Sequence, residues 1–76
     1  MTLSKQQRRA LGIIAGARNG VTMALMRMNG FVPKTLADLV VAGLATVEIE
    51  TVRAGGQLIE VKRFRITDMG RQALIE

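Results

Sequence analysis

The sequence has 76 residues, enough for one domain spanning residues 1–76 but too few to enclose a large pocket. Cysteine and histidine are both absent, which excludes disulfides and removes the usual transition-metal ligands, general base and nucleophile. Eleven Lys and Arg residues against six Asp and Glu residues give a net charge of +5, a balance typical of proteins that bind polyanions.

These properties favour a binding protein over an enzyme. The carboxylates are scattered, and none forms a recognisable catalytic pattern with a serine, threonine or lysine. We therefore expect no enzyme activity, no metal, no cofactor and no small-molecule substrate. No apolar stretch approaches the roughly 18 residues that a membrane helix needs, so we expect no membrane partner. A chain without cysteine suits the reducing cytoplasm, where we expect the protein to act.

The basic residues are concentrated in the first half of the chain. Six of them occur up to Lys34, whereas the first acidic residue is Asp38. This pattern indicates a polyanion binder, although cations that only keep a surface soluble would produce it too. Phe31 and Phe64 are the only aromatic residues, so stacking on single-stranded bases has almost no platform. Duplex DNA is therefore the expected nucleic acid.

The first predicted element is a helix over residues 5–17. Ser4 and Gln7 have the spacing of a capping box, in which each side chain satisfies a backbone N–H at the start of a helix. Gly12 and Gly16 weaken such a helix unless a neighbouring helix crosses close to them. We therefore expect a close helix crossing at these two glycines.

Two shorter helices follow. Thr22 is a suitable N-cap for a helix over residues 23–28, and Pro33 suits the first turn of a helix over residues 33–42 that ends at Gly43. Four apolar residues of this region are expected to pack in the core: Met23, Met26, Met28 and Phe31. The methionines would fill gaps between other side chains, and Phe31 would be an aromatic anchor.

From residue 46 the hydrophobic period changes to two. Residues 46–52 and 58–66 alternate as strands, and Gly55 and Gly56 within the turn 53–57 can take the positive φ angles of a tight hairpin. Val21 is expected to add a single extended residue. Thr67 then caps a last helix over residues 68–75.

This order of elements resembles a winged helix-turn-helix. Residues 21–47 are similar to the family's two-helix unit, and residues 64–74, "FRITDMGRQAL", look like the exit from the wing in MarR-type transcriptional regulators. The sequence lacks the long helices through which MarR-type proteins dimerise. The resemblance implies an α+β fold with a three-helix core, a two-stranded β-hairpin wing and a short C-terminal helix. It also implies a DNA-binding protein in transcription regulation.

The resemblance further implies that the third helix enters the major groove and that the wing reaches the minor groove or backbone. Carried over by position, it assigns DNA contacts to the second helix, the third helix and the wing: Arg27, Lys34, Thr35, Arg53, Gln57 and Lys62. The third helix offers few donors to base edges, and Asp38 would repel phosphate, so we expect weak sequence specificity.

Basic residues also occupy the opening turns of the first helix. Lys5, Arg8 and Arg9 lie where the helix dipole favours anions by roughly 0.3–1 kcal/mol per charge. A nearby phosphate backbone would explain this choice, and so would tolerance of a small cost on an exposed helix. Lys5 and Arg9 therefore join the candidate DNA contacts.

The two faces of the predicted hairpin differ. With a two-residue turn, Glu48 lies opposite Arg63, with Glu50 and Arg65 as diagonal neighbours, so both arginines are assigned to cross-strand pairs. The same face would carry an apolar patch, a candidate contact for a protein partner or a second copy of the chain: Val52, Ile59 and Val61. The alternative function is accordingly a winged-helix module for protein interaction that binds no DNA, with this apolar patch or the methionine-rich second helix as its binding surface.

Overall fold

The computed structural model describes residues 3–76, which form an α+β fold of four helices and a three-stranded antiparallel sheet. The elements in chain order are α1 (Lys5–Gly16), β1 (Val21–Thr22), α2 (Met23–Met28), α3 (Pro33–Val41), β2 (Ala45–Ala54), β3 (Gln57–Ile66) and α4 (Asp68–Ile75). Among these residues no helix is long and apolar enough to span a bilayer, since α1, the longest, has 12 residues.

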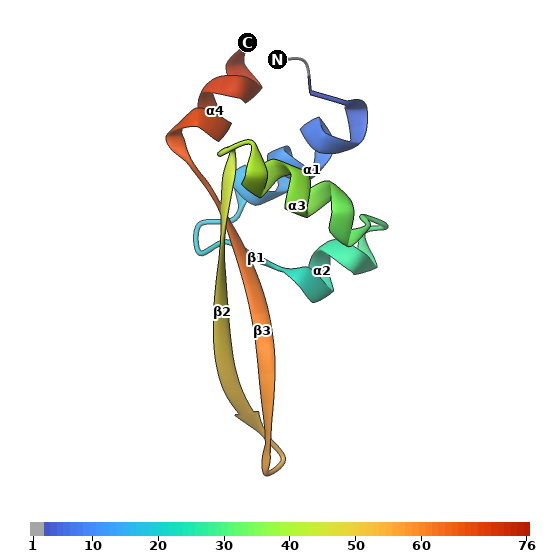
Figure 1. Cartoon of the computed structure of the whole chain (residues 1–76), viewed down its shortest axis with the longest axis vertical. Coiled ribbons are helices and arrows are strands. Elements are labelled where there is room, and N and C mark those ends of the chain that lie inside the picture. The colour runs from blue at the N-terminus through green and yellow to red at the C-terminus, as the bar shows by residue number, and fades with distance from the viewer. Residues whose placement is uncertain (1–2) are drawn as a thin grey trace.

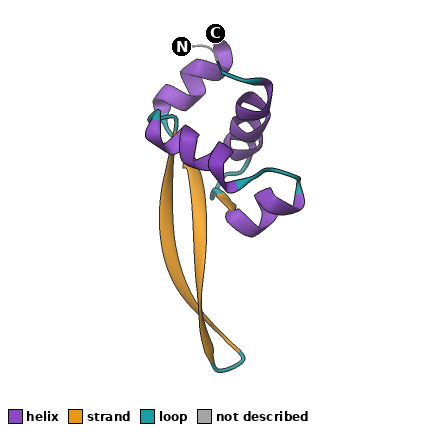
Figure 2. Ribbon diagram, turned by 45° about the vertical axis from the view of Figure 1, so that its right-hand side comes forward, coloured by secondary structure: helices purple, strands orange, loops and turns teal. Residues whose placement is uncertain are grey.

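The molecule has two regions of different shape. The four helices gather at one end, and the β2–β3 hairpin projects away from them (Figure 1). Figure 2 shows that the far half of the hairpin has no helix on either side. The molecule therefore measures 46 × 22 × 20 Å, with the hairpin along its long axis. We call the helical end the head.

The start of α1 is as expected from the sequence. The Ser4 hydroxyl accepts a hydrogen bond from the Gln7 backbone N–H at 3.0 Å, and the Gln7 side chain accepts from the Ser4 N–H at 2.9 Å. The expected helix crossing at Gly12 and Gly16 is wrong, because nothing lies within 4 Å of a Cβ built at either position. Both glycines are exposed, away from the buried side of α1.

One cluster of buried hydrophobic side chains forms the core of the head, drawn from all three amino-terminal helices and the base of the sheet: Ala10, Leu11, Ile14, Val21, Met26, Phe31, Leu36, Leu39, Leu44, Ala45 and Phe64. Burial of Met26 and Phe31 confirms their assignment to the core, and Met23 packs against its edge. The assignment of Met28 is wrong, because its side chain is 84% exposed. It ends a helix of six residues that buries only Met26.

The sheet has the order β1-β3-β2. The predicted extended conformation of Val21 is confirmed, and with Thr22 it forms a third strand beside the expected hairpin: Val21 pairs with Phe64, and Thr22 pairs with Arg63. Gly20 makes this approach possible. Its φ is +83°, and a Cβ there would lie 2.6 Å from the Phe64 carbonyl oxygen. Glycine is therefore needed on both conformational and steric grounds.

The hairpin turn consists of the two residues on which the predicted register was based, and the strands extend closer to it than the predicted strands 46–52 and 58–66. Gly55 and Gly56 have φ angles of 58° and 82°, and the first strand pair beyond them is Ala54 with Gln57. Positive φ at both central positions is the requirement of a type I′ turn, whose twist matches that of the flanking strands. The predicted pairing of Glu48 with Arg63 is confirmed.

Helix α4 is joined to the rest of the head by Thr67 and Gly70. The Thr67 hydroxyl accepts from the Gly70 N–H at 3.0 Å and donates to the Gly43 carbonyl at 2.7 Å, so one side chain caps α4 and ties it to the end of α3. Gly70 is buried, and a Cβ there would collide with the Leu44 carbonyl oxygen. This close backbone approach explains a glycine inside a helix.

Candidate binding surfaces

Most of the basic side chains have no acidic partner. Among residues 3–76, which contain every charged side chain, three ion pairs form: Lys34 with Asp38, Arg63 with Glu50 and Arg65 with Glu48. The sequence has eleven basic and six acidic residues, so eight cations and three carboxylates are left without a partner. Ion pairs within the protein therefore leave the excess of positive charge unneutralised.

The cations at the start of α1 are partly occupied by the head itself. The Arg8 guanidinium donates to the Leu74 carbonyl at 3.5 Å, and the Arg9 guanidinium carbon lies 5.6 Å from the centre of the Phe31 ring. The second contact is a cation–π interaction, which gives Arg9 a structural role beside its predicted DNA contact. Lys5 is exposed.

The predicted contacts on the helices differ in their availability. Lys34 is 83% exposed, but its ammonium lies 3.1 Å from the Asp38 carboxylate. Such an exposed pair is weak, so a phosphate could displace the carboxylate. Thr35, on the same helix, is half-buried. Arg27, in the last turn of α2, is exposed and makes no ion pair.

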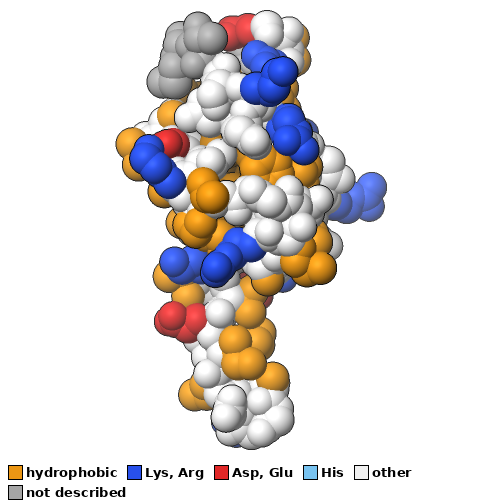
Figure 3. Space-filling view, turned by 90° about the vertical axis from the view of Figure 1, so that its right-hand side faces the viewer, with side chains coloured by type: hydrophobic (Ala, Val, Ile, Leu, Met, Phe, Trp, Pro, Cys, Tyr) orange, Lys and Arg blue, Asp and Glu red, His pale blue; other side chains and the backbone are white. Residues whose placement is uncertain are grey.

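The predicted contacts on the hairpin point to opposite sides. Arg53 and Gln57 are exposed next to the turn, and Lys62 is exposed nearer the head. Because side chains alternate along a strand, the register puts Arg53 and Lys62 on one face and Gln57 on the other. In Figure 3, Lys and Arg side chains occupy several separate places from the head to the hairpin, with hydrophobic and neutral side chains between them.

One face of the hairpin, here called the outer face, carries the predicted cross-strand charge pairs. Both are diagonal: Arg63 contacts Glu50 at 2.9 Å, and Arg65 contacts Glu48 at 3.1 Å. The structural assignment of Arg63 and Arg65 is thereby confirmed. The apolar residues expected on this face are there by register, with Val52 40% exposed, Ile59 43% exposed and Val61 half-buried.

The opposite, inner face carries a more exposed apolar surface that the sequence does not reveal. Ile49 is 60% exposed and Leu58 is 69% exposed, while Val41 at the end of α3 is 87% exposed. A groove of about 360 Å³ runs between α3 and this face, lined by Met23, Pro33, Ala37, Val40, Val41, Val47, Ile49, Lys62 and Phe64. Lys62 is the one charged residue in this lining, so the groove is apolar with a cationic edge.

Strand length explains why the inner face is open. Each strand of the hairpin has ten residues in an extended conformation. Helix α3 has nine residues, but a helix rises less than half as far per residue as a strand, and it lies across the base of the hairpin (Figure 1). Alternation along the sequence indicates correctly that Val47 and Ile49 share a face with Phe64. The alternation does not show where the helical cover ends, so Phe64 is buried while Ile49 is exposed.

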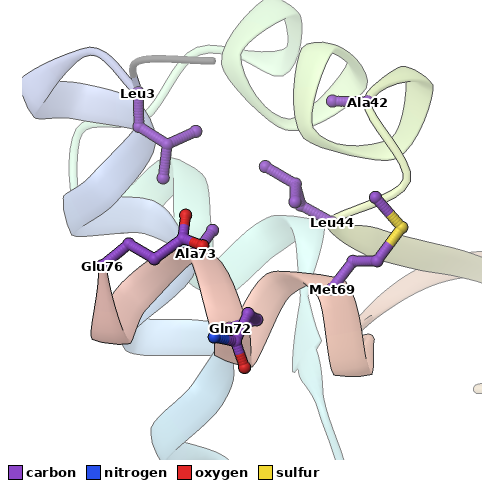
Figure 4. Close-up of a pocket in the computed structure, with 7 residues that line it drawn as sticks. All are labelled: Leu3, Ala42, Leu44, Met69, Gln72, Ala73 and Glu76. Atoms are coloured by element: carbon purple, nitrogen blue, oxygen red, sulfur yellow. The ribbon is translucent and has the colours of Figure 1, made fainter.

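A second, smaller hollow lies between the start of the chain and α4. It has a volume of about 220 Å³ and is lined by Leu3, Ala42, Leu44, Met69, Gln72, Ala73 and Glu76. Figure 4 shows the side chains of Leu3, Leu44 and Met69 around this hollow. It has no basic side chain, and Glu76 would repel an anion, so it does not suit a phosphate.

Within residues 3–76 no group of three or more Asp and Glu side chains is placed to hold a metal ion. No family model matches the chain, and no curated protein or solved structure shows significant similarity to it.

Proposed function

We propose that this chain is a winged-helix protein that binds double-stranded DNA mainly through phosphates, as a regulatory or accessory factor without enzyme activity. The excess of unpartnered cations over unpartnered carboxylates carries the proposal. Duplex DNA is a dense polyanion, and each phosphate that a Lys or Arg neutralises releases counterions. The order of the elements supports the fold assignment, since α2 and α3 follow α1 and precede the hairpin.

The surface of α3 favours contact with phosphates over recognition of bases. Pro33, Ala37 and Val41 line the apolar groove, and Lys34 is held by Asp38. Base edges in the major groove are recognised by donors and acceptors, which this surface provides sparsely. We therefore propose weak sequence specificity, with the strongest contributions from cations that have no partner, such as Arg27 and Arg53. A site of action in the cytoplasm remains a prediction.

The test is a titration of random duplex DNA into the full chain at two salt concentrations. If about six phosphate contacts form, affinity should fall by roughly a thousandfold between about 50 and about 200 mM salt. Arg27→Glu and Arg53→Glu should each weaken binding on unrelated sequences. The variants Arg27→Lys and Arg53→Lys should retain most of the affinity, because a phosphate contact needs the charge more than the guanidinium geometry.

Arg71→Glu on α4 is the matched control, since it makes the same change in net charge on a helix to which no DNA contact is assigned. Equal losses in Arg71→Glu and Arg53→Glu would show that binding depends on total charge alone. Absence of any salt-sensitive binding by the unaltered chain would contradict the proposal.

The apolar hairpin and groove favour a second candidate, a winged-helix module for protein interaction. Both faces of the hairpin expose apolar side chains, which is more typical of a protein contact than of a surface that lies against phosphates. Mapping of amide shifts separates the two candidates. DNA-induced shifts at α1, α2 and the hairpin that vanish with salt support DNA binding, and their absence at low salt supports the interaction module.

A further inference from the structure

On the inner face of the hairpin, the residues of β3 have a pattern of charges that complements itself, whereas Arg53 on β2 adds a cation beside Leu58. Glu60 and Lys62 are both exposed and are two residues apart on β3, so they are neighbours on the same face. Leu58 lies on that face towards the turn, and Phe64 lies on it towards the head. Along β3 the order is therefore apolar, acidic, basic, apolar.

This order matters when two such faces pack against each other. If the two β3 strands run antiparallel about a twofold axis level with Val61, each Glu60 lies opposite the partner's Lys62. The same axis puts each Leu58 level with the partner's Phe64 and Val47, which line the apolar groove. A parallel arrangement would place like charges together, so the sequence of charges favours one orientation.

We propose that two copies of this chain associate through their inner faces, with Leu58 of each copy entering the groove of the other and Glu60 pairing with Lys62 across the interface. Each copy supplies both halves of the contact, as a twofold interface requires. An occupant that combines an apolar side chain with a nearby carboxylate would suit the groove, because Lys62 is its one charged lining residue. Leu58 and Glu60 provide that combination.

From the same surface we expect a weak association that salt strengthens. The interface is a narrow strip along the hairpin, and each copy has a net charge of +5 that repels the other. Added salt shortens the range of this repulsion, from about 10 Å at 0.1 M to about 3 Å at 1 M. It also weakens the two Glu60–Lys62 pairs, but it does not weaken the apolar contact of Leu58, so we expect the loss of repulsion to dominate. We expect a dissociation constant on the order of 10–100 µM, which decreases severalfold between about 50 and about 500 mM salt.

Sedimentation equilibrium of the full chain tests the proposal. Leu58→Lys should weaken the dimer by roughly tenfold or more, because it places a cation in the apolar groove beside Lys62. Ile75→Lys is the matched control, since Ile75 is also an exposed apolar residue, at 78%, and lies at the end of α4 rather than on the hairpin. Ile59→Lys tests the outer face, where the sequence offers the alternative contact for a second copy. Neither change should weaken the dimer. Leu58 is 69% exposed, so its replacement should not affect folding, which circular dichroism would verify.

Charge reversal gives a second, independent measurement. Glu60→Lys and Lys62→Glu should each weaken the dimer, and the double variant should restore it, because opposite charges face each other again. A chain that stays monomeric at millimolar concentration overturns the proposal. A double variant weaker than both single variants overturns it too, as does a greater loss in Ile59→Lys than in Leu58→Lys.

These results are distinguishable from those on DNA binding. Glu60→Lys should weaken the dimer but strengthen binding to duplex DNA, because it adds a cation, whereas Lys62→Glu should weaken both. Salt should strengthen self-association and weaken binding to DNA. Failure of the DNA titration would therefore leave the dimer proposal intact.

Discussion

The head and the hairpin are built on different principles. In the head, side chains from α1, α2, α3 and the base of the sheet are buried together, and Gly20 and Gly70 are fixed by close backbone contacts. In the hairpin, every residue from 51 to 60 is exposed, and the turn glycines have open space around them. Packing therefore constrains the residues of the head, whereas the outer hairpin is free of that constraint. Its exposed apolar and charged residues are better explained by binding.

The largest expected effect is the difference in stability loss between two Leu→Ala changes, one in the head and one in the hairpin. Leu36 on α3 is fully buried, so Leu36→Ala should lower the free energy of unfolding by about 2–5 kcal/mol through lost burial and a cavity. Leu58→Ala in the hairpin should change it by less than about 0.5 kcal/mol. Urea denaturation of the monomer at low protein concentration measures both. Comparable losses would show that the hairpin contributes to the core and would remove the contrast between the two regions.

Two glycines sharpen the comparison within the head. Gly70→Ala should destabilise by about 1–3 kcal/mol, because its Cβ meets backbone atoms of Leu44 that cannot move independently. Gly12→Ala should stabilise by up to about 1 kcal/mol, since the added methyl enters open space in a helix interior. Thermal unfolding followed by circular dichroism should give shifts of opposite sign. Shifts of the same sign would contradict the packing described for α4 or for α1.

The smallest expected effect concerns the outer face. The pair of Arg63 and Glu50 has side chains 25% and 39% exposed, so it should contribute only about 0.2–1 kcal/mol. A double-mutant cycle with Glu50→Gln and Arg63→Gln measures this coupling, which should decrease in high salt. Arg63 also donates to the Asn19 carbonyl, so the single change at Arg63 should cost more than that at Glu50. A larger loss of stability in Glu50→Gln than in Arg63→Gln would show that the hydrogen bond to Asn19 does not contribute to stability.

The sequence predicts the parts of the fold that depend on neighbouring residues. The capping box of Ser4 and Gln7 and the turn at Gly55 and Gly56 are local, and the turn fixes the register of the whole hairpin. The extended Val21 was predicted, but its pairing with Phe64 joins distant parts of the chain, which no local pattern reveals. The helix crossing expected at Gly12 and Gly16 was wrong for a related reason, because the sequence of a helix does not show which of its sides a neighbouring helix covers.

The candidate surfaces are predictable to a smaller extent. Opposite charges at cross-strand positions indicated the ion pairs of Arg63 and Arg65. Because side chains alternate between the two faces along a strand, the register determines which side chains are neighbours. The sequence placed the apolar patch on the outer face, whereas the inner face exposes Ile49 and Leu58 more fully. Exposure there depends on the length of the hairpin relative to α3. That relation emerges only when the elements are assembled.

The strand order has a final consequence for how the molecule opens. Strand β1 supports β3 only at Arg63 and Phe64, so beyond these residues the hairpin is a ribbon whose backbone edges face solvent. Local fraying can therefore begin at the turn and proceed towards the head without disturbing the buried cluster. A partner that binds both strands of the hairpin would oppose this fraying.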